Sequence, residues 1–132
     1  MLDYHIHTTL CNHAEGVMDA YAQRAVDMGL SEICFLDHLT LQHAGKPLSM
    51  TLDEVPLYLQ AAQSIKKRYQ RKIKVKVGLE MDFQPELTDS LYEVSSIFAF
   101  DVIASSVHFV GGVDIVSHAS AWKLKSINRK EP

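Results

Sequence analysis

The run EICFLDH, from Glu32 to His38, decides the fold. It is short, apolar and rich in residues that favour β structure, which is typical of a strand buried on both faces. Both of its flanks indicate helices. On the amino side, the apolar residues between about Val17 and Met28 share one helical face, and Gly29 is a plausible helix stop. On the carboxyl side, a polar loop leads into a second helical stretch from about Leu52 to Gln70, capped by Thr51 or Asp53.

The rest of the chain continues this alternation of strands and helices. Further strands are predicted at Leu2–His7, Ile73–Glu80 and Asp101–His108, and a third helix at about Pro85–Phe98. Strands separated by helices run parallel and are joined by right-handed crossovers, so the fold class is α/β. After Gly111 the pattern weakens, and we expect at most one more strand near Val113–Val116.

Length and composition indicate one globular domain over residues 1–132. The net charge of −3 gives the whole chain no attraction to nucleic acid or to an anionic membrane surface. No apolar run approaches the roughly 20 residues of a membrane span, and the amino terminus lacks a secretory signal pattern. The only two cysteines, Cys11 and Cys34, are too few for a disulfide framework, so a reducing, cytoplasmic setting is predicted.

Ionisable residues gather where the predicted strands end. His5 and His7 close the first strand, His38 the second, Glu80 the third and His108 the fourth. The carboxyl ends of parallel strands open on one face of a sheet or barrel, so these side chains should converge there. Imidazole and carboxylate groups ligate zinc, iron or manganese, and a carboxylate can bridge two ions. A divalent metal site is therefore predicted at this end.

The HIH stretch has its own geometry. Residues two apart on a strand project to the same side, so His5 and His7 can face one cation, with His13 reaching back from the following loop.

Several neighbouring polar residues stay ambiguous on sequence alone. Cys11 is a possible soft ligand, although packing beside the site is favoured, and His43 is interpreted as a surface residue. Asp3, Asp37 and Asp82 can each orient a neighbour or fill a structural role, and His118 is open between ligand and surface residue; these residues all stand near predicted strand ends or in the uncertain tail.

The basic run KKRYQRKIKVK, from Lys66 to Lys76, superficially suggests a nucleic-acid patch. It occupies the end of a helix and the start of the third strand, which is the face opposite the predicted metal site. Cations at a helix carboxyl end also suit the helix dipole. A solvated surface is the preferred interpretation, and no nucleic-acid partner is predicted.

Four motifs in order, DYHIHT (Asp3–Thr8), LDH (Leu36–His38), GLE (Gly78–Glu80) and SVHF (Ser106–Phe109), resemble the polymerase and histidinol phosphatase (PHP) family. The forms SVHF and CNHA are most similar to its histidinol-phosphate phosphatase branch. The resemblance implies a distorted (β/α) barrel with up to three divalent metal ions at its carboxyl face. It places the metal ligands on the following residues: His5, His7, His13, His38, Glu80 and His108.

The same resemblance implies that His5, His7, Glu80 and His108 hold the ions that activate water, with Glu80 as the bridging carboxylate. The family site also uses a further histidine and a late Asp-x-His pair. This chain has no D-x-H after Glu80, and His118 is the only substitute for the further histidine. A complete barrel of this type needs roughly 200 or more residues. We therefore expect an incomplete barrel of about four to five strands, truncated at its carboxyl end. Its open edge invites self-association or a swapped dimer.

The sequence is consistent with three functions. The leading one is a metal-dependent phosphoric monoester hydrolase, with L-histidinol phosphate as the small phosphorylated substrate and histidine biosynthesis as the setting. The second is a metal-binding but catalytically incomplete fragment, and the third is a nuclease of the type found beside bacterial polymerases.

Overall fold

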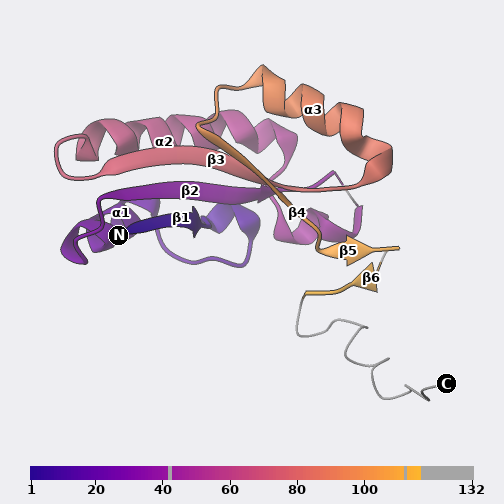
Figure 1. Ribbon diagram of the computed structural model, residues 1–132, viewed down its shortest axis with the longest axis horizontal. Coiled ribbons are helices and arrows are strands. Elements are labelled where there is room, and N and C mark those ends of the chain that lie inside the picture. The colour runs from indigo at the N-terminus through magenta and orange to yellow at the C-terminus, as the bar shows by residue number, and fades with distance from the viewer. Residues whose placement is uncertain (42, 112, 117–132) are drawn as a thin grey trace, which may run out of the picture.

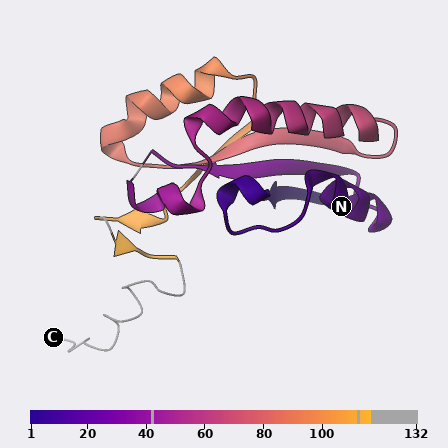
Figure 2. The same ribbon diagram turned by 180° about the vertical axis from the view of Figure 1, so that it is seen from behind.

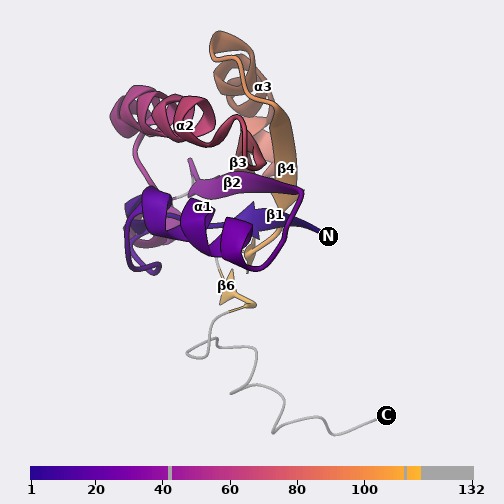
Figure 3. The same cartoon turned by 90° about the vertical axis from the view of Figure 1, so that its left-hand side faces the viewer.

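The computed structural model describes residues 1–41, 43–111 and 113–116. Four parallel strands form one sheet in the order β1-β2-β3-β4, which follows the order of the sequence. Their bounds are β1 Leu2–Ile6, β2 Glu32–Leu39, β3 Lys74–Asp82 and β4 Val102–Ser106. The sheet curls, and its three crossover helices lie along its outer side, which gives half of a barrel (Figures 1 and 3). The predicted α/β class and the incomplete barrel are confirmed.

The helices are α1 Met18–Asp27, α2 Val55–Tyr69 and α3 Thr88–Ile97. Gly29, at φ +69°, follows α1 as the expected stop, and Leu30 N donates to Ala25 O at 3.0 Å. α2 and α3 start three residues later than predicted, because a short 3₁₀ turn precedes each of them. Within the described part of the chain, no helix combines the length and apolar character needed to cross a bilayer.

The core lies between the sheet and the helices, and the central strand β2 is its middle. Ile33, Cys34 and Phe35 of β2 are fully buried, as the apolar run predicts. Tyr58 of α2 is also fully buried. Its hydroxyl lies 2.8 Å from Phe35 O and 2.9 Å from Gly78 O, so it links the helix to both central strands. This packing holds β2 and β3 in the register that aligns their ends.

The segment after β4 differs from the simplest expectation. β5 Phe109–Val110 and β6 Val113–Asp114 pair with each other in antiparallel register, and they add nothing to the parallel sheet. Gly111, at φ +56°, allows the tight turn. This hairpin lies at the end of the sheet where the parallel strands finish, close to the 3₁₀ segment η2 His43–Leu48 (Figure 2).

The basic run is paired with acidic residues at the opposite end of the sheet. Lys74 and Lys76 contact Glu32 at 3.2 and 3.1 Å, and Lys66 contacts Asp101 at 2.9 Å. Glu32 and Lys74 are register partners at the start of their strands, so this location confirms that the run lies away from the carboxyl ends.

Acid should weaken this paired surface. A hydrogen bond from Tyr4 and the ammonium groups of Lys76 and Lys74 lower the pKa of Glu32 to about 2. The folded pKa is below the unfolded value near 4.3, so the stabilisation is present above that value and is lost as the pH falls toward 2. We expect Glu32→Gln to lower the urea midpoint at pH 7, and most of the gap to the unmodified chain to be lost by pH 2.5. Glu93→Gln, at an exposed position on α3, is the control. A gap of the same size at both pH values would contradict this account.

Candidate metal centre

Glu80 stands at the centre of the site, near the end of β3. It is only 5% exposed, and four imidazole rings approach its carboxylate. Its Oε2 lies 3.0 Å from His5 Nε2, 3.3 Å from His38 Nδ1 and 3.7 Å from His7 Nε2, and its Oε1 lies 3.8 Å from His108 Nε2. The rings come from the ends of β1, β2 and β4 or from the residues that follow them. The structure therefore brings the predicted residues around one buried carboxylate.

The five rings form a continuous cluster. Neighbouring ring centroids are 4.4 Å apart for His7 and His38, 4.9 Å for His5 and His7, 4.9 Å for His38 and His108, and 5.1 Å for His13 and both His7 and His38. Among the described residues, three groups place one ligating atom per residue within 4.8 Å of one another, and two of them contain Glu80: His5, His7 and Glu80, and then His38, Glu80 and His108. Glu80 belongs to both groups, as a bridging carboxylate would.

A bulge in β1 shapes the first of these groups. Asp3 pairs with Ile33 and Ile6 with Phe35, so β1 holds one residue more than β2 over the same length. The side chain of Asp3 accepts a hydrogen bond from His5 N at 3.1 Å within this irregular stretch. Asp3 thus supports the backbone that presents His5.

Asp37 anchors the loop that carries His7. Its carboxylate is fully buried and accepts hydrogen bonds from Thr8 N at 3.1 Å, from the Thr8 hydroxyl and from His38 N at 3.0 Å. His7 Nδ1 is buried without a hydrogen-bond partner, and Asp37 Oδ1 is 3.6 Å from it. Of the two roles considered for Asp37, the structure supports that of orienting its neighbours.

Asp82 is the functional candidate that the sequence left ambiguous. Its carboxylate accepts a hydrogen bond from His108 Nδ1 and another from Ser106 Oγ at 3.0 Å. A carboxylate oxygen only accepts, so Nδ1 of His108 carries the proton and Nε2 faces Glu80 with its lone pair. Metal-ligating histidines are typically oriented in this way. The two-residue spacing from Glu80, which puts both carboxylates on one face of β3, is the signal that points to Asp82.

The same logic applies to His13. Its Nδ1 lies 2.9 Å from Cys11 O, and a carbonyl oxygen accepts only, so Nε2 is left available. The thiol of Cys11 is fully buried and donates to Thr8 O at 2.9 Å. Burial raises the pKa of this thiol, which keeps it protonated and favours the packing role. Cys11 does lie within ligating reach of His7 and His13.

Burial keeps His38 neutral. Removal from water is the largest cause that lowers its pKa, to about 4. Glu80 opposes this shift, whereas the rings of His7, His108 and His13 add to it. Neutral imidazole is the form that binds metal, so His38 is prepared as a ligand at any pH near 7. His118 and the side chain of His43 lie outside what the structure describes.

A buried carboxylate shared by imidazoles at the carboxyl end of a parallel half-barrel defines the class: an α/β barrel-type domain built around a metal-ligand cluster. The sequence profile of the PHP domain matches residues 3–129, and the chain belongs to this family. The resemblance drawn from the four motifs is thereby confirmed.

Relatives place the chain more closely within the family. It is 37% identical over 112 residues to a probable histidinol-phosphatase of Deinococcus radiodurans, covering 84% of this chain and 43% of that protein. It is 30% identical over 132 residues to the histidinol-phosphatase of Lactococcus lactis, covering 98% of this chain and 48% of that protein. The chain thus spans about half the length of the curated relatives it matches.

Solved structures share the fold. The histidinol phosphate phosphatase of Lactococcus lactis, complexed with zinc, L-histidinol and phosphate, superposes with a TM-score of 0.83 at 28% identity, covering 94% of this chain and 46% of that one. A putative histidinol phosphatase of Listeria monocytogenes has the same fold, with a TM-score of 0.73 at 23% identity.

The contact between Asp82 and His108 gives a direct test of the site. Asp82→Asn removes the charge that orients His108, and we expect divalent metal affinity to fall about 10- to 100-fold. Zinc titration against a competing chelator measures this change. Asp89→Asn, an equally conservative change at an exposed position of α3, should leave the affinity unaltered. If Asp82→Asn and the unmodified chain bound zinc with equal affinity, Asp82 would have no role in the metal centre.

Proposed function

We propose that this chain is a metal-dependent phosphoric monoester hydrolase that converts L-histidinol phosphate and water to L-histidinol and phosphate. The observation that carries the proposal is the buried carboxylate of Glu80 with four imidazole nitrogens within 3.8 Å of it. The named activities of the relatives and the ligands in the Lactococcus lactis structure supply the substrate.

The residues present fit divalent ions. His7 Nε2 and His38 Nδ1 lie 3.7 and 3.3 Å from Glu80 Oε2, and His38 stays neutral, so imidazole nitrogens and a carboxylate oxygen, the usual ligands of such ions, lie together. The residues that would hold zinc, iron or manganese are His5, His7, His13, His38, Glu80 and His108. When bound, such ions supply positive charge to the phosphate oxygens and lower the pKa of water.

The protein side chains perform the remaining tasks. Glu80 holds the two ligand groups at one point, and its burial keeps bulk water from screening its charge. Asp82 and the carbonyl of Cys11 fix the tautomers of His108 and His13. Asp37 holds the His7 loop against β2. The cluster is therefore preorganised before any substrate arrives.

Metal content and turnover, measured on the same preparation, test the proposal. We expect zinc, iron or manganese to copurify with the chain, and phosphate release from L-histidinol phosphate to exceed that from p-nitrophenyl phosphate. Chelation should stop turnover, and re-addition of metal should restore it. Turnover that is indifferent to a chelator would refute the proposal.

A second candidate is a metal-binding domain without turnover of its own. It is favoured because the described ligands all come from one half-barrel, in a chain that spans about half the length of its relatives. Bound metal without phosphate release from either substrate would support this candidate over the first.

The exposed edge of the sheet supports a further proposal, that two copies of the chain associate. β4 pairs only with β3 among the described strands. Ile103 within β4 is 45% exposed, and Val107, which follows it, is 48% exposed. Unpaired parallel edges with apolar neighbours favour strand pairing between chains. Sedimentation at micromolar concentration should show a dimer, whereas a compact monomer would contradict this proposal.

A further inference from the structure

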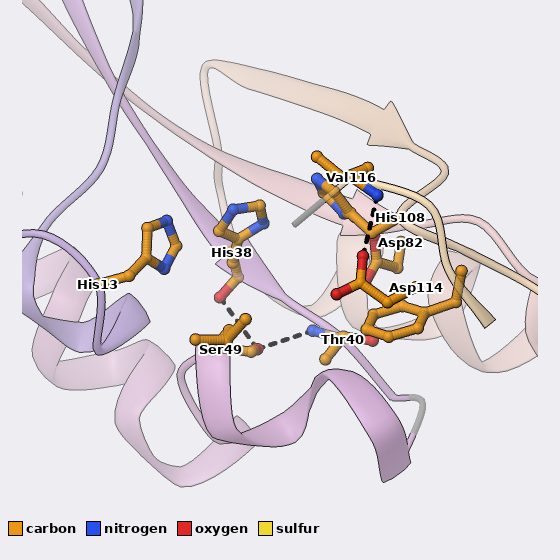
Figure 4. A pocket seen from close by; sticks show the side chains of 10 residues that line it. His13, His38, Thr40, Ser49, Asp82, His108, Asp114 and Val116 are labelled. Atoms are coloured by element: carbon orange, nitrogen blue, oxygen red, sulfur yellow. Dashed lines mark hydrogen bonds and ion pairs between the residues drawn. The ribbon is translucent and has the colours of Figure 1, made fainter. Parts of the chain in front are cut away.

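A cavity of about 160 Å³ opens beside the metal-ligand cluster. His38 and His108 belong to the cluster and also line this cavity, and Leu48 and Ser49 line it from the loop that follows β2 (Figure 4). Ser49 is only 3% exposed although it lies in a loop. A buried hydroxyl needs hydrogen-bond partners, and the partners of this one lie at the end of β2.

The hydroxyl of Ser49 fastens the loop to β2. Ser49 Oγ accepts a hydrogen bond from Thr40 N at 2.8 Å (Figure 4). Its proton faces two main-chain carbonyl acceptors, Met50 O at 2.8 Å and His38 O at 3.2 Å. Met50 N also donates to His38 O at 3.1 Å, and Met50 forms a parallel bridge with Leu39. The chain that leaves β2 at Thr40 is therefore tied back to that strand at Ser49.

The backbone of His38 is held on both sides as a result. Its N–H donates to Asp37 Oδ1 at 3.0 Å, and its carbonyl oxygen contacts Ser49 Oγ. The ring of His38 reaches the shared carboxylate, with Nδ1 at 3.3 Å from Glu80 Oε2. Because a side chain follows its backbone, a shift at the end of β2 would carry this nitrogen away from Glu80. Ligand sets tolerate displacements of only a fraction of an ångström, so the support of His38 matters for binding.

We propose that Ser49 is a positioning residue of the metal centre, whose hydroxyl holds the end of β2 so that His38 keeps its place among the ligands. The proposal rests on the ligand set of the proposed function and concerns the binding of metal. Ser49 does not bind the ion itself. It acts through main-chain atoms of His38 and Thr40, so loss of the hydroxyl weakens the site without removing a ligand.

Ser49→Ala tests this role, because alanine removes the hydroxyl and leaves the backbone. We expect the affinity for zinc to fall about tenfold, as is typical when a group that orients a ligand is lost. Zinc titration against a competing chelator measures this fall. The visible absorption of bound cobalt, which depends on the geometry of its ligands, should change as well. Ser49→Thr keeps the hydroxyl and can place its extra methyl group in the cavity, so it should retain both the zinc affinity and the cobalt spectrum.

Two controls separate positioning from general stability. Ser64→Ala removes a hydroxyl that donates to Gln60 O at 2.9 Å on the exposed side of α2, and it should leave the zinc affinity unaltered. Gly29→Ala strains the turn after α1, at the end of the sheet where β2 begins, because Gly29 has φ +69°. It should lower the urea midpoint without lowering the zinc affinity. Circular dichroism of each variant checks that the sheet is intact.

Three results would overturn the proposal: an unchanged zinc affinity in Ser49→Ala, a loss in Ser49→Thr as large as that in Ser49→Ala, or the same loss in Gly29→Ala. The proposed function is judged separately by phosphate release. If Ser49→Ala bound zinc normally while the unmodified chain released phosphate, the positioning role would be wrong and the hydrolase would stand. Zinc binding that depends on Ser49, without turnover of L-histidinol phosphate, would support the positioning role and reject the hydrolase.

Discussion

Glu80→Gln should remove most of the bound metal and reduce any turnover of L-histidinol phosphate by about 1,000-fold. The side chain keeps its size, so the fold should persist, but the negative charge shared by four imidazoles is lost. Loss of an orienting group around a metal typically costs 10- to 100-fold in affinity, and loss of a shared ligand should exceed about 100-fold. Metal content after dialysis, measured by mass spectrometry, gives the first readout, and phosphate release gives the second.

The matched control for Glu80→Gln is Glu93→Gln, the same chemical change at an exposed position of α3. It should retain the metal content and turnover of the unmodified chain. Far-ultraviolet circular dichroism of both variants checks that the sheet is intact. If the Glu80→Gln variant kept its full metal content, Glu80 would not be a metal ligand, and the proposed bridging role would be wrong.

Gly78→Ala should destabilise the fold by about 3 kcal/mol. A Cβ at this position would lie 2.4 Å from Val102 O and 2.8 Å from Leu36 Cδ1. Gly78 and Val102 are register partners, so the added methyl group would push β4 away from β3. This is a large share of the 5–15 kcal/mol that stabilises a typical domain. Urea unfolding followed by circular dichroism measures the change.

Gly29→Ala is the comparison for this second substitution. Gly29 has φ +69° and open space around its Cα, so its replacement costs only backbone strain of about 1 kcal/mol. If the two alanine variants unfolded at the same urea concentration, the close approach of β3 and β4 would not explain the loss of stability in Gly78→Ala. Gly78→Ala should also lower metal affinity. Gly78 stands two residues before Glu80 on β3, and β4 leads to His108, so moving β4 away from β3 would separate these two ligands.

The local sequence determined the fold class and most of the cluster. The spacing of apolar residues predicted each parallel strand and helix. A helix buried on one face and a strand buried on both faces each produce a characteristic pattern of apolar residues that are near one another in the sequence. His38 and Glu80 each stand near the end of such a strand. The rule that parallel strands share a carboxyl end was therefore enough to bring them together.

Other features depend on pairing between distant segments, which no local pattern contains. The bulge in β1 exists only in relation to β2, and the bond from His108 to Asp82 depends on the register of β3 with β4. The hairpin after β4 shows both sides. One more strand was predicted near residues 113–116, and β6 does form there, but it pairs with β5 and forms no part of the parallel sheet.

The sequence alone thus fixed which side chains meet at the end of the sheet, since their spacing follows from strand and helix lengths. Only the tertiary structure decided how they are oriented. Asp82 and the carbonyl of Cys11 accept hydrogen bonds that orient the rings of His108 and His13, and Asp37 accepts one from Thr8 N that holds the loop carrying His7. Orientation of this kind depends on contacts between residues far apart in the chain, and those contacts exist only once the core has formed.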